Sequence, residues 1–98
     1  MLFEEPGIII SGITEQGNKF RPSDWVERIA SDFASFEKRK LHYNNLVKPV
    51  MHDGEKRLFM ANRFSQLNPQ GFQFVMEFAM RNHLKVEQVD VTAFSEVA

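Results

Sequence analysis

The chain has 98 residues, 26% charged side chains, no cysteine and a formal net charge of −1. This length supports one hydrophobic core, so we expect a single domain over residues 1–98, with an ordered core at about 8–91 and loose ends. The composition excludes disulfides, thiolate catalysis and cysteine-bound zinc, and the absence of a ~20-residue apolar stretch and of a basic leader predicts a cytoplasmic protein without membrane contact.

The first third of the chain predicts a strand and a helix. Residues 8–13 are β-branched and apolar enough to form a strand that is buried on both faces. After a turn at 15–18, residues 19–21 are candidates for a short arm that pairs back on this strand, which would change the topology. A helix follows, with Ser23 as N-cap, an apolar stripe from Trp25 to Phe36, and the basic residues 38–40 at its C-terminus.

Residues 46–62 alternate with a period of two, which predicts a β-hairpin. Asp53-Gly54 is a preferred two-residue type I′ turn, and His52 then faces Glu55. Pro49 cannot donate a ladder hydrogen bond, so its strand is expected at a sheet edge or bulged. Counting outward from the turn, one face is apolar and ends at Lys56. The opposite face is mixed and basic, and carries Lys48, Val50, His52, Glu55, Arg57, Phe59 and Ala61.

The last third predicts a second helix and a final strand. Asn68 is a typical N-cap with Pro69 at the first helical position, and Phe74 projects on the polar side of this helix. The strand runs from Leu84 to about Val91, with a bulge expected near residues 87–88. The order βαββαβ predicts an α+β fold, a two-layer ferredoxin-like sandwich in which two helices cover one face of a four-stranded antiparallel sheet.

Three segments resemble a family of short proteobacterial proteins that is catalogued as a domain of unknown function. They are Phe-Arg-Pro-Ser-Asp-Trp at 20–25, Pro-Val-Met-His-Asp-Gly at 49–54, and a helix rich in Phe and Ala at 72–82. The resemblance covers roughly residues 8–90 and implies a bacterial cytoplasmic protein. It implies no activity, ligand or functional residue.

The neutral total charge divides unevenly along the chain. The net charge is −4 over residues 1–37, +5 over residues 38–63 and −2 over the remainder. An uneven charge distribution can mark an anion-binding surface, and it is also typical of a solvated hairpin. The hairpin face is therefore the first candidate binding site, and Phe74 is a secondary contact candidate. The candidate binding residues are Lys48, His52, Arg57, Phe59, Lys56 and Arg63.

The sequence has no recognisable catalytic constellation. His42, His52 and His83 are not spaced as helical metal ligands, and no glycine-rich phosphate loop is present, so we expect no metal, no cofactor and no enzymatic activity. His83 is expected to pack or to cap its helix.

Three functions fit the candidate face. We expect a protein-interaction or regulatory module that uses an exposed sheet face to bind a protein partner or a second copy of the chain. The first alternative is RNA or another nucleic acid bound on the basic hairpin face, with Phe59 stacked on a base. The second alternative is a regulatory domain that binds a small molecule at a homodimer interface.

Overall fold

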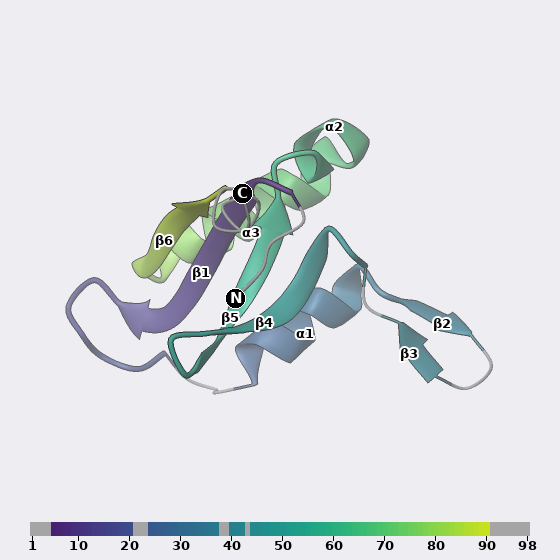
Figure 1. The fold of residues 1–98 in the computed structure, drawn as a ribbon. Coiled ribbons are helices and arrows are strands. Elements are labelled where there is room, and N and C mark those ends of the chain that lie inside the picture. Colours follow the sequence, from purple (N-terminus) through teal and green to yellow (C-terminus); the bar gives the residue numbers. More distant parts are fainter. Residues whose placement is uncertain (1–4, 21–23, 38–39, 43, 91–98) are drawn as a thin grey trace, which may run out of the picture.

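The computed structural model describes residues 5–20, 24–37, 40–42 and 44–90 (Figure 1). These residues form one α+β unit with two short additions to the expected element order. The elements are β1 (Gly7–Thr14), α1 (Trp25–Asp32), β2 (Ser35–Glu37), β3 (Lys40–His42), β4 (Val47–His52), β5 (Glu55–Ala61), α2 (Phe64–Leu67), α3 (Pro69–Arg81) and β6 (Leu84–Val89).

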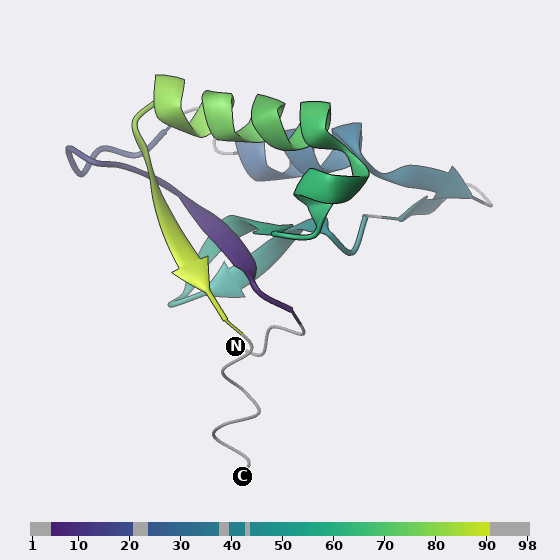
Figure 2. The same cartoon turned by 90° about the horizontal axis from the view of Figure 1, so that it is seen from above.

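Four strands form an antiparallel sheet in the order β4-β5-β1-β6. The helices α1 and α3 lie over one face of this sheet, which gives two layers (Figure 2). The expected ferredoxin-like sandwich is therefore confirmed. The additions are α2 and the small β2–β3 hairpin, which projects sideways from the sandwich (Figures 1 and 2).

The main hairpin has the predicted register. His52 pairs with Glu55, and both turn residues have positive φ, 53° for Asp53 and 75° for Gly54, as a type I′ turn requires. Pro49 lies in β4, which is an edge strand, as expected for a residue without an N–H to donate.

The core lies between the sheet and the two helices. Ile10, Leu58 and Met60 point from the sheet and are fully buried, and Val26 of α1 and Val75 of α3 are buried above them. An aromatic group closes one end of this core, where Phe20 meets Trp25 and Phe78 edge-on and Trp25 stacks on Phe78. The apolar stripe of each helix thus faces the sheet and forms the helix side of the core.

The first helix is shorter than predicted. It ends at Asp32, and Phe36 lies in β2 instead of on a helical stripe. The basic residues therefore do not follow a helix C-terminus: Lys40 begins β3, while 38–39 lie outside the described residues. A stripe with helical spacing continues past Asp32 in the sequence, but the chain turns at Phe33 and pairs as strand. Ser23, the expected N-cap, lies outside the described residues.

The second helix begins as predicted. Asn68 is its N-cap and accepts a hydrogen bond from the Gly71 backbone N–H at 2.9 Å, with Pro69 in the first turn. After the helix, His83 is exposed, so the expectation that it packs is wrong, but its backbone caps the helix end: its φ is 55° and its N–H donates to the Met80 carbonyl at 3.2 Å. Its backbone carbonyl also accepts a hydrogen bond from the Glu15 N–H at 2.8 Å.

The bulge lies in a different strand from the one predicted. Residues 86–89 of β6 pair regularly with β1, while the register shift lies in β1 between Ile10 and Thr14. Lys19 forms an isolated bridge to Ile13, and the Phe20 N–H donates to the Gly12 carbonyl at 2.7 Å, so the expected arm pairs back on β1 without forming a strand of its own among the described residues; Arg21 lies outside them. The predicted loose tail, from Thr92, also lies outside them.

Candidate functional site

The hairpin register confirms that the four central candidates share one face. Lys48 pairs with Phe59, His52 pairs with Glu55, and Arg57 alternates with them on β5. Lys56, which alternates with Arg57 on β5, pairs with Glu27 of α1, so these residues occupy the sheet face turned away from the helix layer seen in Figure 2. The register prediction is therefore confirmed, but the surroundings of Arg57 and Phe59 differ from the expectation.

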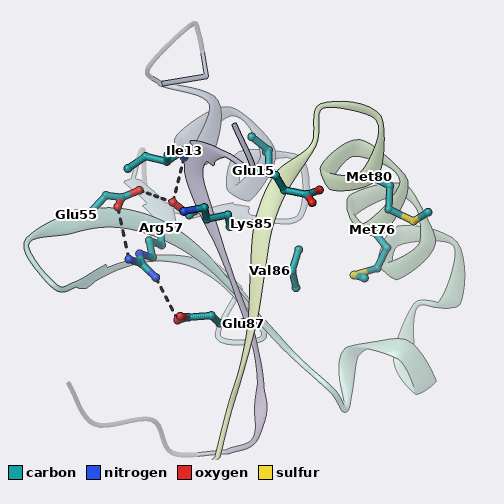
Figure 3. A pocket seen from close by; sticks show the side chains of 11 residues that line it. Ile13, Glu15, Glu55, Arg57, Met76, Met80, Lys85, Val86 and Glu87 are labelled. Atoms are coloured by element: carbon teal, nitrogen blue, oxygen red, sulfur yellow. Dashed lines mark hydrogen bonds and ion pairs between the residues drawn. The ribbon is translucent and has the colours of Figure 1, made fainter. Parts of the chain in front are cut away.

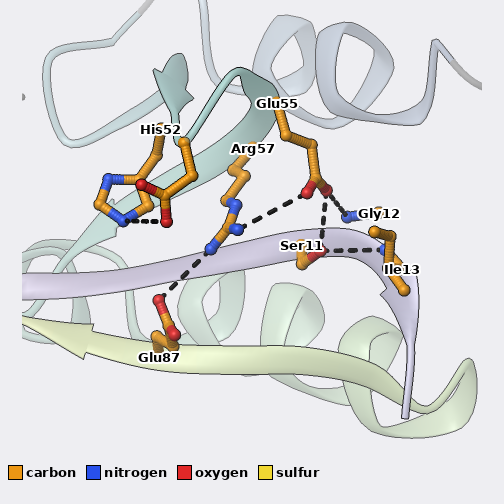
Figure 4. Close-up of polar contacts among 8 residues, drawn as sticks. Ser11, Gly12, Ile13, His52, Glu55, Arg57 and Glu87 are labelled. Carbon is orange, nitrogen blue, oxygen red and sulfur yellow. Dashed lines mark hydrogen bonds and ion pairs between the residues drawn. The ribbon is translucent and has the colours of Figure 1, made fainter. Parts of the chain in front are cut away.

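Arg57 is held between two carboxylates. Its Nη2 lies 3.5 Å from Glu55 Oε2 and its Nη1 lies 3.3 Å from Glu87 Oε2, which joins β5 to β6 across the intervening strand (Figure 4). The side chain is mostly buried, and its Nε meets no acceptor among the described residues. The guanidinium is therefore compensated within the fold and is not an open anion site.

Phe59 is buried, contrary to the expectation of an exposed stacking surface. The residue is 2% exposed and belongs to the core cluster together with its cross-strand neighbour Ile9. The Lys48 ammonium lies 5.9 Å from the centre of the Phe59 ring, in a cation–π contact. Alternation assigned the face correctly, but this part of the face is covered, so the ring offers no platform for a base.

Two further candidates lie away from the hairpin face. Lys56 forms an ion pair with Glu27 of α1, on the helix side of the sheet. Arg63 lies just before α2 and binds Glu5 through two hydrogen bonds of 2.9 and 3.1 Å. These hydrogen bonds lower the pKa of the Glu5 carboxyl below its usual 4.5, because they stabilise the charged form. His52 lies 3.5 Å from the Asp53 carboxylate at the turn. Lys56 and Arg63 therefore lie apart from Arg57, whereas His52 shares its face of the hairpin.

A polar network at the β1 bulge was missed by the sequence reasoning. Ser11 is buried, donates its hydroxyl hydrogen to Glu55 at 2.8 Å, and accepts from the Ile13 N–H at 3.0 Å. The Glu55 carboxylate also accepts from the Gly12 N–H at 3.1 Å (Figure 4). At the bulge, the backbone N–H groups of Gly12 and Ile13 thus donate to side-chain oxygens and not to a neighbouring strand. The signal was Ser11-Gly12 inside an otherwise apolar strand.

A cavity of about 700 Å³ lies beside this network. Most of its charged groups lie on one side of β6 together with Ile13, and the methionines of α3 lie on the other side together with Glu15 (Figure 3). The charged side includes Arg57, Glu55 and Glu87, while Met76, Met80 and Val86 form the apolar side. The cavity thus follows β6 and has both charged and apolar lining.

The strand β6 forms one edge of the sheet (Figure 1). Among the residues that the structure describes, no strand pairs with its outer side. Val86, near its middle, is 40% exposed although it shares a face with the buried Ile10, and Met80 of α3 is 70% exposed beside it. Phe74 projects from α3 as predicted and is 49% exposed. Of the large apolar side chains that are exposed in the described residues, Phe74, Met80 and Val86 lie on α3 and β6, while Leu67 lies on α2 and Met51 on β4.

Within the described ranges, no group of three acidic or histidine side chains is arranged to hold a metal ion. None of the helices in the part of the chain covered by the structure is long and apolar enough to span a membrane.

Comparisons with known proteins identify relatives but no activity. No protein with a curated function matches the chain. A solution structure described as the first structural representative of its family matches with 37% sequence identity and a TM-score of 0.77, covering 93% of this chain and 90% of the other. Residues 4–89 match the family described as "Protein of unknown function (DUF3579)", and the chain belongs to this family.

Proposed function

We propose that the protein is a non-enzymatic interaction module of the bacterial cytoplasm that binds a protein partner by strand addition at the outer edge of β6. The observation that carries this proposal is an unpaired edge of six residues with an exposed valine near its centre. An unprotected edge presents backbone N–H and C=O groups that a partner strand can satisfy.

The two edges of the sheet differ in a way that supports this assignment. The other edge strand, β4, contains Pro49, which removes one backbone donor from its ladder. The sequence of β6, from Leu84 to Val89, contains neither proline nor glycine, and its pairing with β1 is regular from Val86 to Val89. A partner strand therefore finds a more continuous set of hydrogen-bonding groups on β6.

Apolar surface beside the edge also supports strand addition. Val86 and Met80 lie on the helix side of β6 and are 40% and 70% exposed, and Met76 lines the adjoining cavity. Side chains of an added strand would cover this surface, and its burial would contribute free energy in proportion to the apolar area removed from water.

The nucleic-acid alternative has less support. Arg57, Lys56 and Arg63 each face a carboxylate of the chain itself, and Phe59 is buried. Binding of phosphate groups would have to replace these ion pairs, which reduces the gain from counterion release.

A site-specific cross-linking experiment tests the proposal. The photoreactive residue benzoylphenylalanine replaces Val86 in the full chain, which is expressed in bacteria and irradiated. We expect a covalent adduct of higher mass on denaturing gels. The matched control places the same residue at Met51, which is also exposed but lies on the β4 edge, and should give little adduct. Absence of an adduct from position 86, or equal adducts from both positions, would overturn the proposal.

A further inference from the structure

We infer that the partner at β6 is a second copy of this chain, and that the two β6 strands pair antiparallel with Val86 opposite Val86. This inference rests on the proposed function and names the occupant of the same edge. A two-fold axis perpendicular to the sheet would join the two four-stranded sheets, each ordered β4-β5-β1-β6, into one continuous sheet. The helices of both copies would then lie on the same side.

The charges of β6 are complementary to themselves in this register. In an antiparallel pair centred on Val86, Lys85 of each copy lies opposite Glu87 of the other. Both residues alternate with Val86, so they lie on the sheet face away from the helices, where Glu87 shares a face with Ile9. The dimer would therefore contain two equivalent Lys–Glu pairs on one face and the valine pair on the other.

The neighbouring symmetric registers are unfavourable. With a two-fold axis perpendicular to the sheet, directly opposite residues point to the same face. The axis must therefore pass beside one residue and its own copy, and the alternative registers place this axis at a neighbouring residue. An axis at Lys85 places two lysines opposite each other, and an axis at Glu87 places two glutamates opposite each other. Like charges directly opposite destabilise a strand pair. The charge pattern thus selects Val86 as the centre.

The surroundings of these two charges are consistent with the pairing. Lys85 is exposed and has no acidic partner among the described residues. Glu87 is bound to Arg57 on one side, yet 61% of its side chain remains accessible. In the dimer, Glu87 would accept from Arg57 of its own copy and from Lys85 of the other, which extends the partly buried network of the β1 bulge across the interface.

The apolar side of the interface has matching exposed groups. Val86 of each copy would be covered by the other valine, and Met80, which projects from α3 beside it, would contribute flexible apolar surface. Methionine adapts its shape to an interface more readily than branched side chains do. In the dimer, β6 would therefore form the Lys85–Glu87 ion pairs on one face of the sheet and bury Val86 on the other.

Charge reversal with complementation tests the register. Sedimentation velocity of the full chain should show a dimer whose population rises with concentration. Lys85→Glu and Glu87→Lys should each raise the dimer dissociation constant about tenfold or more, because each replaces both opposite-charge pairs with like-charge pairs. Asp32→Lys, an exposed charge reversal at the end of α1, makes the same net charge change as Glu87→Lys and should leave dimerisation unchanged.

Mixing the two single variants is the decisive step. In the mixed dimer, the two acids of the Lys85→Glu chain lie opposite the two lysines of the Glu87→Lys chain, so an equimolar mixture should recover the dimer that each variant alone has lost. An unfolded variant could not give this recovery. A monomeric parent chain at all concentrations, or a mixture that stays monomeric, would overturn the inference. A cross-link from position 86 to a different protein would also overturn it, but would leave the proposed function standing.

Discussion

The cations of the hairpin differ in role from one residue to the next. Alternation from the Asp53-Gly54 turn predicted correctly that Arg57 and Phe59 share a face. It could not predict that Arg57 is clamped by two carboxylates or that Phe59 is buried, because Glu87 arrives from a strand 30 residues away and burial depends on the whole sheet. The face on which a side chain lies follows from the local alternation of its strand, whereas its burial and its partners depend on the other strands of the sheet.

The Glu5–Arg63 pair gives a pH-dependent prediction. Because Arg63 lowers the pKa of Glu5 in the folded state, the pair stabilises the fold above the unfolded pKa, and this contribution is lost as the pH falls through the folded pKa. Arg63→Ala should therefore raise the pKa of Glu5 toward 4.5 and make acid unfolding less steep below that pH. Carbon-detected NMR titration of the Glu5 carboxyl measures this shift.

The control for this titration is Arg28→Ala. Arg28 also binds a carboxylate, that of Asp24 at 2.9 Å, but makes no contact with Glu5. Its replacement should leave the Glu5 titration unchanged. An unaltered Glu5 pKa in the Arg63→Ala variant would show that another group holds the carboxylate in its charged form.

At the scale of elements, the sequence predicted which main helices and strands exist better than it predicted where each of them ends. The strand, helix, hairpin, helix and strand were all placed, since each has its own periodicity or cap, such as Asn68 before α3. The end of α1 at Asp32 and the short α2 were missed because tertiary contacts override local periodicity there. The bulge was assigned to β6 from its irregular alternation, but it lies in β1, where Ser11 and Glu55 supply the missing ladder partners.

The β1 bulge predicts a measurable cost for Ser11→Ala. The change removes the acceptor of the Ile13 N–H and one donor to Glu55, so we expect a loss of about 1–3 kcal/mol in the free energy of unfolding. Urea unfolding followed by circular dichroism measures it. Ser65→Ala is the matched control, because its hydroxyl also hydrogen-bonds to the main chain but is exposed, and it should cost less. Equal costs for both variants would contradict the structural role of Ser11.

At the scale of the whole molecule, the sequence predicted the architecture but only part of the candidate site. Periodicity and element order led to the antiparallel four-stranded sheet with helices on one face. The predicted site was the open hairpin face, whereas the cavity and the exposed Val86 and Met80 lie at β6 and the adjoining part of α3, on the opposite edge from β4. The predicted ferredoxin-like topology already makes the last strand an edge, but periodicity alone did not show that Val86 and Met80 would stay exposed beside a cavity there.

An isotope-filtered NOE measurement tests the central claim, that β6 is the edge through which the chain associates. It uses an equimolar mixture of carbon-13-labelled and unlabelled chain at a concentration that favours association. The account predicts intermolecular contacts between the Val86 methyl groups of the labelled copy and β6 of the unlabelled copy. Intermolecular contacts that involve β4, such as those of Met51, or none at β6, would contradict it.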